Sequence, residues 1–432
     1  MRKKNTTMRV YLLIPLLIPL LILGGTSVRA GQDFFELPPI KYSQTASQDA
    51  VAKMAAEIEL GDWVVGNVDG KAFLKAVLKK LNIPEESQVL VFSKTSFQNS
   101  LINQRNPRSI YFSMDAYVGW VPGGKVEVII EDEKLGPVFY TIDPPFGDRP
   151  AKIVRATDSC LQCHATSRTS GVPGMFIRSV VPDQNSHPIL SAGTSLVTDS
   201  TPLRERWGGW YVSGSSDDPH LGNRWIPESV LDGVEFKPEV SGHKDLSALI
   251  NTEKYLQPTS DIVALMVLEH QCRTHNLITK AKMGYQRALY FQKSYSEGGD
   301  LDSHDGMSWK MAEGSAKQIV EAFLFASEID PGGDGVEGSD EFAEAFKERG
   351  VKTEKGKSLR DLRLYGRIFK NRCSYMIHSL AFKGLPELIK ERVYHHLREE
   401  LGKEADNHLS SREKKTLLGI LEETVPGFRS EP

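Results

Sequence analysis

Cysteine is scarce in this chain, with 4 residues among 432. Small secreted proteins that are held together by disulfides have a much higher density of cysteine, so this class is excluded. Basic residues are not in excess either, because 53 Lys and Arg stand against 56 Asp and Glu. Nucleic-acid binding depends largely on positive charge that faces the phosphate backbone. We therefore expect no nucleic-acid partner.

Several enzyme signatures are also missing. The chain contains no Gly-x-Ser-x-Gly, no P-loop and no His-Glu-x-x-His, and no Gly-x-Gly-x-x-Gly that opens a helix after a predicted strand. We therefore expect any chemistry to come from a bound cofactor.

The longest apolar run lies near the N-terminus, at residues 10–23, after a basic stretch that ends at Arg9. Val28 and Ala30 provide small residues for a signal peptidase, and the run is shorter than the ~20 residues that span a bilayer. We expect a signal peptide in residues 1–30, cleaved after Ala30, and a periplasmic or otherwise exported protein. If this segment is not cleaved, it is the one expected contact with a membrane, because no comparable run follows.

The most informative motif is Cys160-Leu161-Gln162-Cys163-His164. In an exported protein, Cys-x-x-Cys-His is typical of c-type haem attachment. Two thiolates one helical turn apart can each add to a vinyl group of one porphyrin, and the adjacent imidazole can then ligate the iron. The motif predicts one covalent haem c, attached at Cys160 and Cys163, with His164 as the proximal ligand.

Two other interpretations of the motif, a redox dithiol and a zinc site, fit the sequence less well than haem attachment does. A redox dithiol normally follows a strand and opens the helix of a βαβ unit, whereas residues 155–159 are polar. A zinc site would need a second pair of ligands at close spacing, and the other two cysteines, Cys272 and Cys373, are far away in sequence. In an oxidising compartment these two could form a disulfide, or both could be buried free thiols.

The sixth iron ligand is left open by the sequence. A methionine would raise the reduction potential, a second histidine would lower it, and an open site would permit ligand binding or peroxide chemistry. The candidates are Met175, His187, His220, Met266, His270 and His275. Near them, residues 203–212 hold arginines that could pair with haem propionates and tryptophans that could pack on the ring, or form an ordinary core edge.

The N-terminal region, residues 31–244, is predicted to be α+β. Capping residues and apolar periodicity predict helices at residues 49–60 and after Asp69. Short β-branched and aromatic runs predict an antiparallel sheet. These runs are residues 88–92, 109–112, 117–120, 125–130 and 137–142, followed by 176–181, 189–196 and 209–212.

The C-terminal region, residues 245–432, is predicted to be an all-α bundle of about four to six helices. Apolar periodicity places helices at residues 261–295, 358–382, 385–401 and 411–423. Residues 215–245 are rich in Ser, Asp, Gly and Pro and are interpreted as a linker or a loop that covers the haem.

Several stretches carry a resemblance to a known family. They are residues 106–112, 117–124, 136–143, 160–164, 171–174, 178–183 and 205–212. On these residues the chain resembles exported bacterial proteins with a single-haem cytochrome c domain, and the resemblance covers most of the mature chain. It implies haem binding through Cys160, Cys163 and His164 and possible electron transfer, and it implies no substrate. The layout, with a sheet before the motif, also resembles PAS-like haem c domains of some bacterial sensors.

Three functions are consistent with these features. The first is an electron-transfer protein with a redox partner protein and a protein-supplied sixth ligand. The second is a haem-based sensor or ligand-binding module. The third is a peroxidase-like enzyme in which His270 or His275 assists peroxide cleavage.

Overall fold

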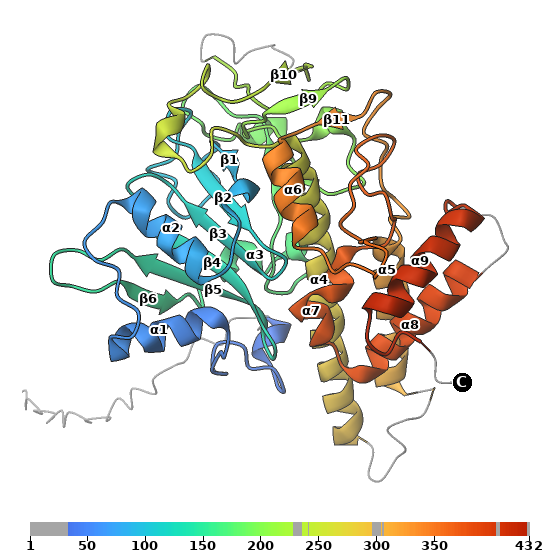
Figure 1. Cartoon of the computed structure of the whole chain (residues 1–432). Coiled ribbons are helices and arrows are strands. Elements are labelled where there is room, and N and C mark those ends of the chain that lie inside the picture. The colour runs from blue at the N-terminus through green and yellow to red at the C-terminus, as the bar shows by residue number, and fades with distance from the viewer. Residues whose placement is uncertain are drawn as a thin grey trace, which may run out of the picture.

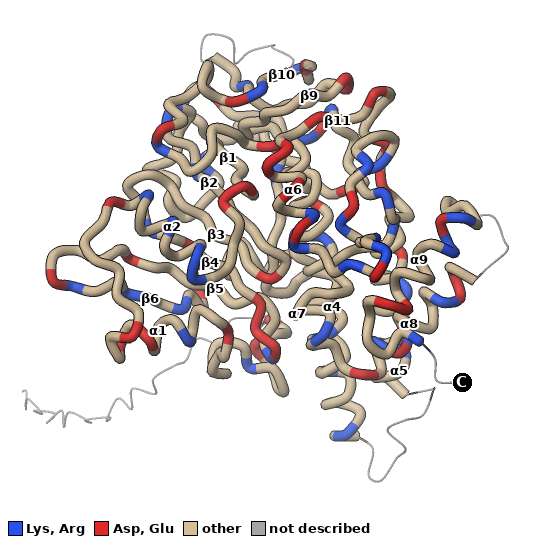
Figure 2. Tube along the Cα trace, in the orientation of Figure 1, with Lys and Arg blue, Asp and Glu red and all other residues tan. Residues whose placement is uncertain are grey.

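The computed structural model describes residues 33–227, 236–240, 242–295, 304, 306–402 and 407–429. The expected signal peptide, residues 1–30, lies outside this range. The architecture is α+β, as predicted, with an antiparallel sheet on one side and most helices on the other (Figure 1). Acidic and basic residues are interspersed along the described chain (Figure 2). No helix within the described ranges is both long and apolar enough to cross a membrane.

The main sheet is a six-stranded antiparallel meander in which each strand pairs with its neighbours in sequence. Its strands are β1 (Val89–Val91), β2 (Arg108–Phe112), β3 (Ala116–Trp120), β4 (Val126–Asp132), β5 (Gly136–Asp143) and β6 (Lys152–Arg155). The first five confirm the predicted strands. The sixth was not predicted, because it is short and has charged residues at both ends.

Two helices cover one face of this sheet, α1 (Ala50–Leu60) and α2 (Gly70–Lys80), and both confirm the sequence prediction. Their caps are those expected: Asp49 accepts hydrogen bonds from two backbone amides of the first turn of α1, and Asp69 accepts one in α2. Apolar residues of α2 pack with alternate residues of β3, such as Val118 and Trp120. This leaves the intervening residues of β3, including Tyr117 and Gly119, to face the opposite side.

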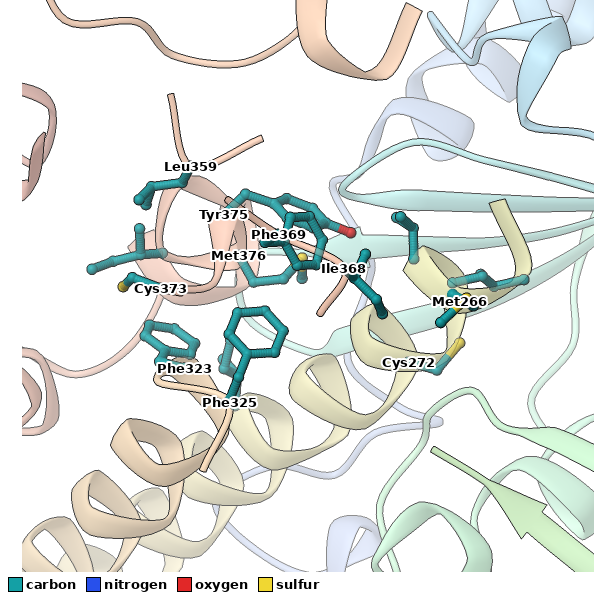
Figure 3. Packing of buried hydrophobic residues seen from close by; sticks show 14 of the residues in the cluster. Met266, Cys272, Phe323, Phe325, Leu359, Ile368, Phe369, Cys373, Tyr375 and Met376 are labelled. Carbon is teal, nitrogen blue, oxygen red and sulfur yellow. The ribbon is translucent and has the colours of Figure 1, made fainter. Parts of the chain in front are cut away.

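The opposite face of the sheet is covered by α4 (Ile262–Tyr295), a helix of 34 residues. On its other side α4 packs against α5, α5 packs against α8, and α8 packs against α9. These helices are α5 (Met307–Phe323), α8 (Glu387–Gly402) and α9 (Ser411–Thr424). A single hydrophobic cluster extends from β1 to α9. The regions 31–244 and 245–432 therefore share one core, and Figure 3 shows a part of it.

The helix expected at residues 358–382 was wrong. Only a short 3-10 turn, Tyr375–His378, and α7 (Leu380–Lys383) are helical there. Side chains form hydrogen bonds to the backbone of Ser358 instead. The side-chain amide of Asn371 donates to the Ser358 carbonyl, and the carboxylate of Asp361 accepts from the Ser358 backbone amide. Such local bonds compete with helix formation. Helices α5 and α6 (Asp340–Glu348) were not predicted.

Smaller sheets hold the segments after the motif. Strand β7 (Ile177–Val180) pairs with β8 (Thr194–Val197), which confirms the first expected strand and part of the second. The strand expected at residues 209–212 was wrong, since this segment makes only an isolated bridge from Trp210 to Val91. The expected linker contributes β9 (Gly214–Ser216) and β10 (Gly242–His243), and β9 also pairs with β11 (Val336–Glu337).

Candidate functional site

The Cys-x-x-Cys-His motif forms a single helical turn directly after the main sheet. Helix α3 spans Leu161–His164, Cys160 is its N-cap residue, and the amide of His164 donates to the carbonyl of Cys160 over 2.9 Å. Cys160 is half-buried and Cys163 is exposed. Both thiols are free, and the helical turn places them on the same side of the helix, as attachment to one ring requires.

The hydrogen bond of His164 fixes its tautomer. Its Nδ1 lies 2.9 Å from the carbonyl oxygen of Gly174. A carbonyl can only accept, so Nδ1 carries the proton and Nε2 keeps a free lone pair. Burial lowers the pKa of His164, which favours the neutral ring. The ring packs against those of Phe139 and Phe176, whose centroids are each 5.2 Å from its own. A neutral imidazole with an oriented, free Nε2 is the form that ligates metals.

His164 faces a cavity of about 90 Å³ between the main sheet, the loop after α3 and helix α4. Arg108 and Glu127 line it from β2 and β4 and form an ion pair. Gly119 lies between them on β3, and a Cβ at that position would be 2.0 Å from Nη2 of Arg108. Glycine is therefore required there for the arginine to cross the strand. Met175 and Cys272 also line the cavity.

Met175 is held in place by Asn276 of α4. The side-chain amide of Asn276 donates to the carbonyl of Met175 over 2.6 Å, and its oxygen accepts from the amide of Met175 over 3.0 Å. Both residues are buried. The clamp fixes the loop that carries Gly174, the hydrogen-bond partner of His164. Asn276 is thus a positioning residue for the candidate ligand.

The two sulfur groups in the cavity differ in chemistry. Burial raises the pKa of the Cys272 thiol, so it stays protonated at neutral pH. The thioether of Met175 needs no deprotonation to bind a metal. Cys272 and Cys373 are both free and buried, and they lie at opposite ends of the side chains drawn in Figure 3.

The two histidines of α4 have other partners. His270 contacts the carboxylate of Asp199 over 2.9 Å through Nδ1 and the hydroxyl of Ser374 over 2.7 Å through Nε2. His275 contacts the hydroxyl of Tyr117 over 3.2 Å and the carboxylate of Glu131 over 2.8 Å. Both ring nitrogens of each histidine are thus engaged, and neither residue lines the cavity.

The remaining candidate ligands also lie elsewhere. His187 is exposed on a loop, where its backbone amide donates to Asp183. His220 is buried, packs against Trp207 with centroids 5.1 Å apart, and accepts from the amide of Gly222. Met266 is fully buried in the core. Of the candidates named from the sequence, the structure brings only Met175 to the same cavity as His164.

Residues 203–212, the segment with arginines and aromatic residues after β8, pack mainly in the core. Arg206 is 1% exposed, forms an ion pair with Glu269 over 2.5 Å and donates to the carbonyl of Thr201. The indole of Trp207 donates to the same carboxylate. Arg204 is exposed beside Glu205. Only Trp210 lines the cavity, so this segment supplies one apolar wall.

The donor set of this site fits a c-type haem. Two free thiols and an imidazole with a free Nε2 are the groups that the cofactor requires. The cavity of about 90 Å³ is smaller than a porphyrin, so haem could bind between His164 and Met175 only if the side chains that line the cavity moved apart. The Arg108 guanidinium beside His164 could bind a propionate if it exchanged Glu127 for it.

Sequence reasoning missed Arg108, Glu127, Gly119 and Asn276. The first three lie in or beside stretches that carried the family resemblance, but their role depends on strand pairing. Gly119 lies opposite Glu127 in the register of β3 and β4. Asn276 directly follows His275, which the sequence suggested only as a candidate ligand. No family model, curated protein or solved structure matches the chain.

Proposed function

We propose that this protein is an exported monohaem c-type cytochrome that transfers electrons to or from a partner protein. Haem would be attached to Cys160 and Cys163, with His164 as proximal ligand. The haem-bearing part would be the main sheet with its α1, α2 and α3 helices. Its PAS-like character stays a prediction, as does cleavage after Ala30.

The observation that carries the proposal is the hydrogen bond from Nδ1 of His164 to the carbonyl of Gly174. It leaves Nε2 as a lone-pair donor beside a cavity, next to two thiols at haem c spacing. Haem, when bound, supplies a one-electron couple between ferrous and ferric iron. The chain would hold the iron in a largely apolar setting.

We propose Met175 as the sixth ligand. It lines the same cavity as His164, its backbone is fixed by Asn276, and its thioether is a donor at any pH. A sixth ligand from the protein favours electron transfer over gas sensing or peroxide chemistry, which need an open position. The peroxidase alternative also loses support, since His270 and His275 use both ring nitrogens elsewhere.

The test is an optical spectrum of protein made in a host that matures c-type cytochromes. Haem should stay with the chain after acid-acetone extraction, and the reduced protein should be low-spin and inert to carbon monoxide. Cys160→Ser with Cys163→Ser should abolish covalent haem. A chain that carries no covalent haem under these conditions would overturn the proposal.

The ligand assignment is tested by Met175→Leu, with Cys272→Ser as the matched control from the same cavity. Met175→Leu should give a high-spin iron that binds carbon monoxide and a lower reduction potential, because a thioether ligand raises the potential. Cys272→Ser should leave the spectrum unchanged. The opposite pattern would assign the ligand to Cys272, and a wild-type iron that binds carbon monoxide would favour the sensor.

A further inference from the structure

A second and larger cavity is lined by residues other than those of the motif. Its volume is about 790 Å³, and residues of α1, the main sheet, α6 and α7 line it. None of Cys160, Cys163 and His164 is among the residues that line it. The cavity is large enough for an organic ligand of ordinary size.

The most unusual residue of this cavity is Arg360. Its side chain is buried at 7% exposure, and its guanidinium lies over the rings of Phe346 and Tyr375, 4.7 and 4.8 Å from their centroids. Among the described residues its side chain makes one hydrogen bond, a long one of 3.3 Å from Nη1 to the carbonyl of Phe346. Within the described residues, Arg360 forms no ion pair with a carboxylate.

A buried guanidinium without a carboxylate partner is costly, because desolvation of the charge is not compensated. The contrast with Arg206 shows the usual arrangement: that arginine is also buried and pairs with Glu269 over 2.5 Å. Stacking on two aromatic rings offsets part of the cost for Arg360, but most of its N–H donors have no acceptor among the described residues. These N–H groups can donate to the two oxygens of a bidentate anion.

Four acidic residues line the same cavity, Asp49, Asp115, Glu131 and Glu133, and the first three have other partners. The fourth, Glu133, is exposed. Glu131 contacts His275 over 2.8 Å, Asp115 accepts from the amide of Leu380 over 2.7 Å, and Asp49 caps α1 and accepts from Tyr140. None forms an ion pair with Arg360. Exposed basic side chains line the cavity as well, and these are Lys53, Arg349 and Lys383.

The remainder of the lining is largely apolar. Phe112 and Ile130 contribute from the sheet, and Phe342 and Phe346 from α6. The rings of Phe112 and Phe342 are 6.1 Å apart, and those of Phe342 and Phe346 are 5.7 Å apart. An apolar or aromatic group would find van der Waals partners here, within reach of the guanidinium.

We propose that this cavity binds a small organic carboxylate, with its anionic group on Arg360 and its apolar body against Phe112, Phe342 and Phe346. The ligand completes the ion pair that the protein leaves open. The proposal is independent of haem and holds whether or not the motif carries it.

The test is calorimetric titration of the full-length mature protein with hexanoate and 3-phenylpropionate, each compared with its uncharged amide. At least one carboxylate should bind, with an affinity about tenfold or more above that of its amide, which corresponds to ~1.4 kcal/mol. This comparison needs no variant, so it decides the matter even if substitution of Arg360 prevents folding.

Two variants locate the site. Arg360→Met should abolish the preference for the carboxylate. The matched control is Arg398→Met, since Arg398 also lies over a ring, that of Phe428 at 5.7 Å, and donates to the carbonyl of the same residue, but lies outside the cavity. It should bind as the wild type does. Equal affinity for acid and amide, no binding of either acid at millimolar concentration, or unchanged binding by Arg360→Met would overturn the proposal.

Discussion

The clamp between Asn276 and the Met175 loop allows a quantitative prediction. Asn276→Ala removes two hydrogen bonds, of 2.6 and 3.0 Å, and leaves a buried amide and carbonyl of Met175 without these partners. Each bond contributes about 1 kcal/mol net, and an unsatisfied buried group adds to the loss. We expect the free energy of unfolding to fall by about 2 to 4 kcal/mol.

Gly174 lies against the same Asn276 side chain, so a substitution at Gly174 also tests the clamp. A Cβ on Gly174 would lie 2.2 Å from Oδ1 and 2.9 Å from Cγ of Asn276, and the nearest atom of another residue would be Cβ of Thr169 at 3.3 Å. Gly174→Ala should therefore push the Asn276 amide away from Met175 and destabilise the protein by about 1 to 3 kcal/mol. In the Asn276→Ala background the new methyl group meets no amide oxygen, so most of this cost should disappear.

The measurement is a double-mutant cycle on the mature protein by urea unfolding. The expected coupling energy between the two substitutions is about 1 to 2 kcal/mol, as for residues in contact. Gly314→Ala is the control for the general effect of alanine, because Gly314 lies within α5 and a Cβ there meets no atom within 4 Å. It should stabilise the protein by up to ~1 kcal/mol. Additive costs for Gly174→Ala and Asn276→Ala would refute the clamp.

Other predictions concern charge. Burial would raise the pKa of Asp199, but its hydrogen bond to His270 and the charges of His270 and Arg273 outweigh burial and lower the pKa to about 2. This folded-state pKa lies below the unfolded value, so the contribution of ~2 kcal/mol is present above pH ~4 and is lost between pH ~4 and ~2. Asp199→Asn should remove that acid dependence in urea unfolding, and an unchanged profile would contradict the assignment. Gly119→Ala should displace Arg108 from Glu127 and lower the melting temperature. Gly66→Ala is the control, because Gly66 is exposed and a Cβ there meets no atom within 4 Å; equal effects would argue against the steric role of Gly119.

The sequence predicted the local parts of this fold well. Caps at Asp49 and Asp69 and apolar periodicity located α1 and α2, and alternating strands located most of the meander, because these signals depend on neighbours a few residues apart. The failure at residues 358–382 has the same origin. Apolar residues there recur at helical spacing, but they are buried by loops that side-chain bonds hold in place.

The candidate site also combines features that neighbouring residues predict with features that depend on the fold. The motif predicts three haem-binding residues because the signature of haem c attachment lies within five consecutive residues. The clamp could not be predicted, since Met175 and Asn276 are separated by 101 residues. Histidines in α4 looked equally suitable as ligands from spacing alone, and only the fold shows that carboxylates and hydroxyls occupy their ring nitrogens.

The order of elements along the chain has a consequence for assembly. All six strands of the main sheet pair with their sequence neighbours, so these pairings do not wait for later parts of the chain. Helix α4, which closes the cavity with Cys272, begins about 100 residues after the motif. Until α4 docks, the cavity lacks one wall. If the chain binds haem as we propose, haem offered while the exported chain is still folding should be incorporated far more efficiently than haem added to the folded protein.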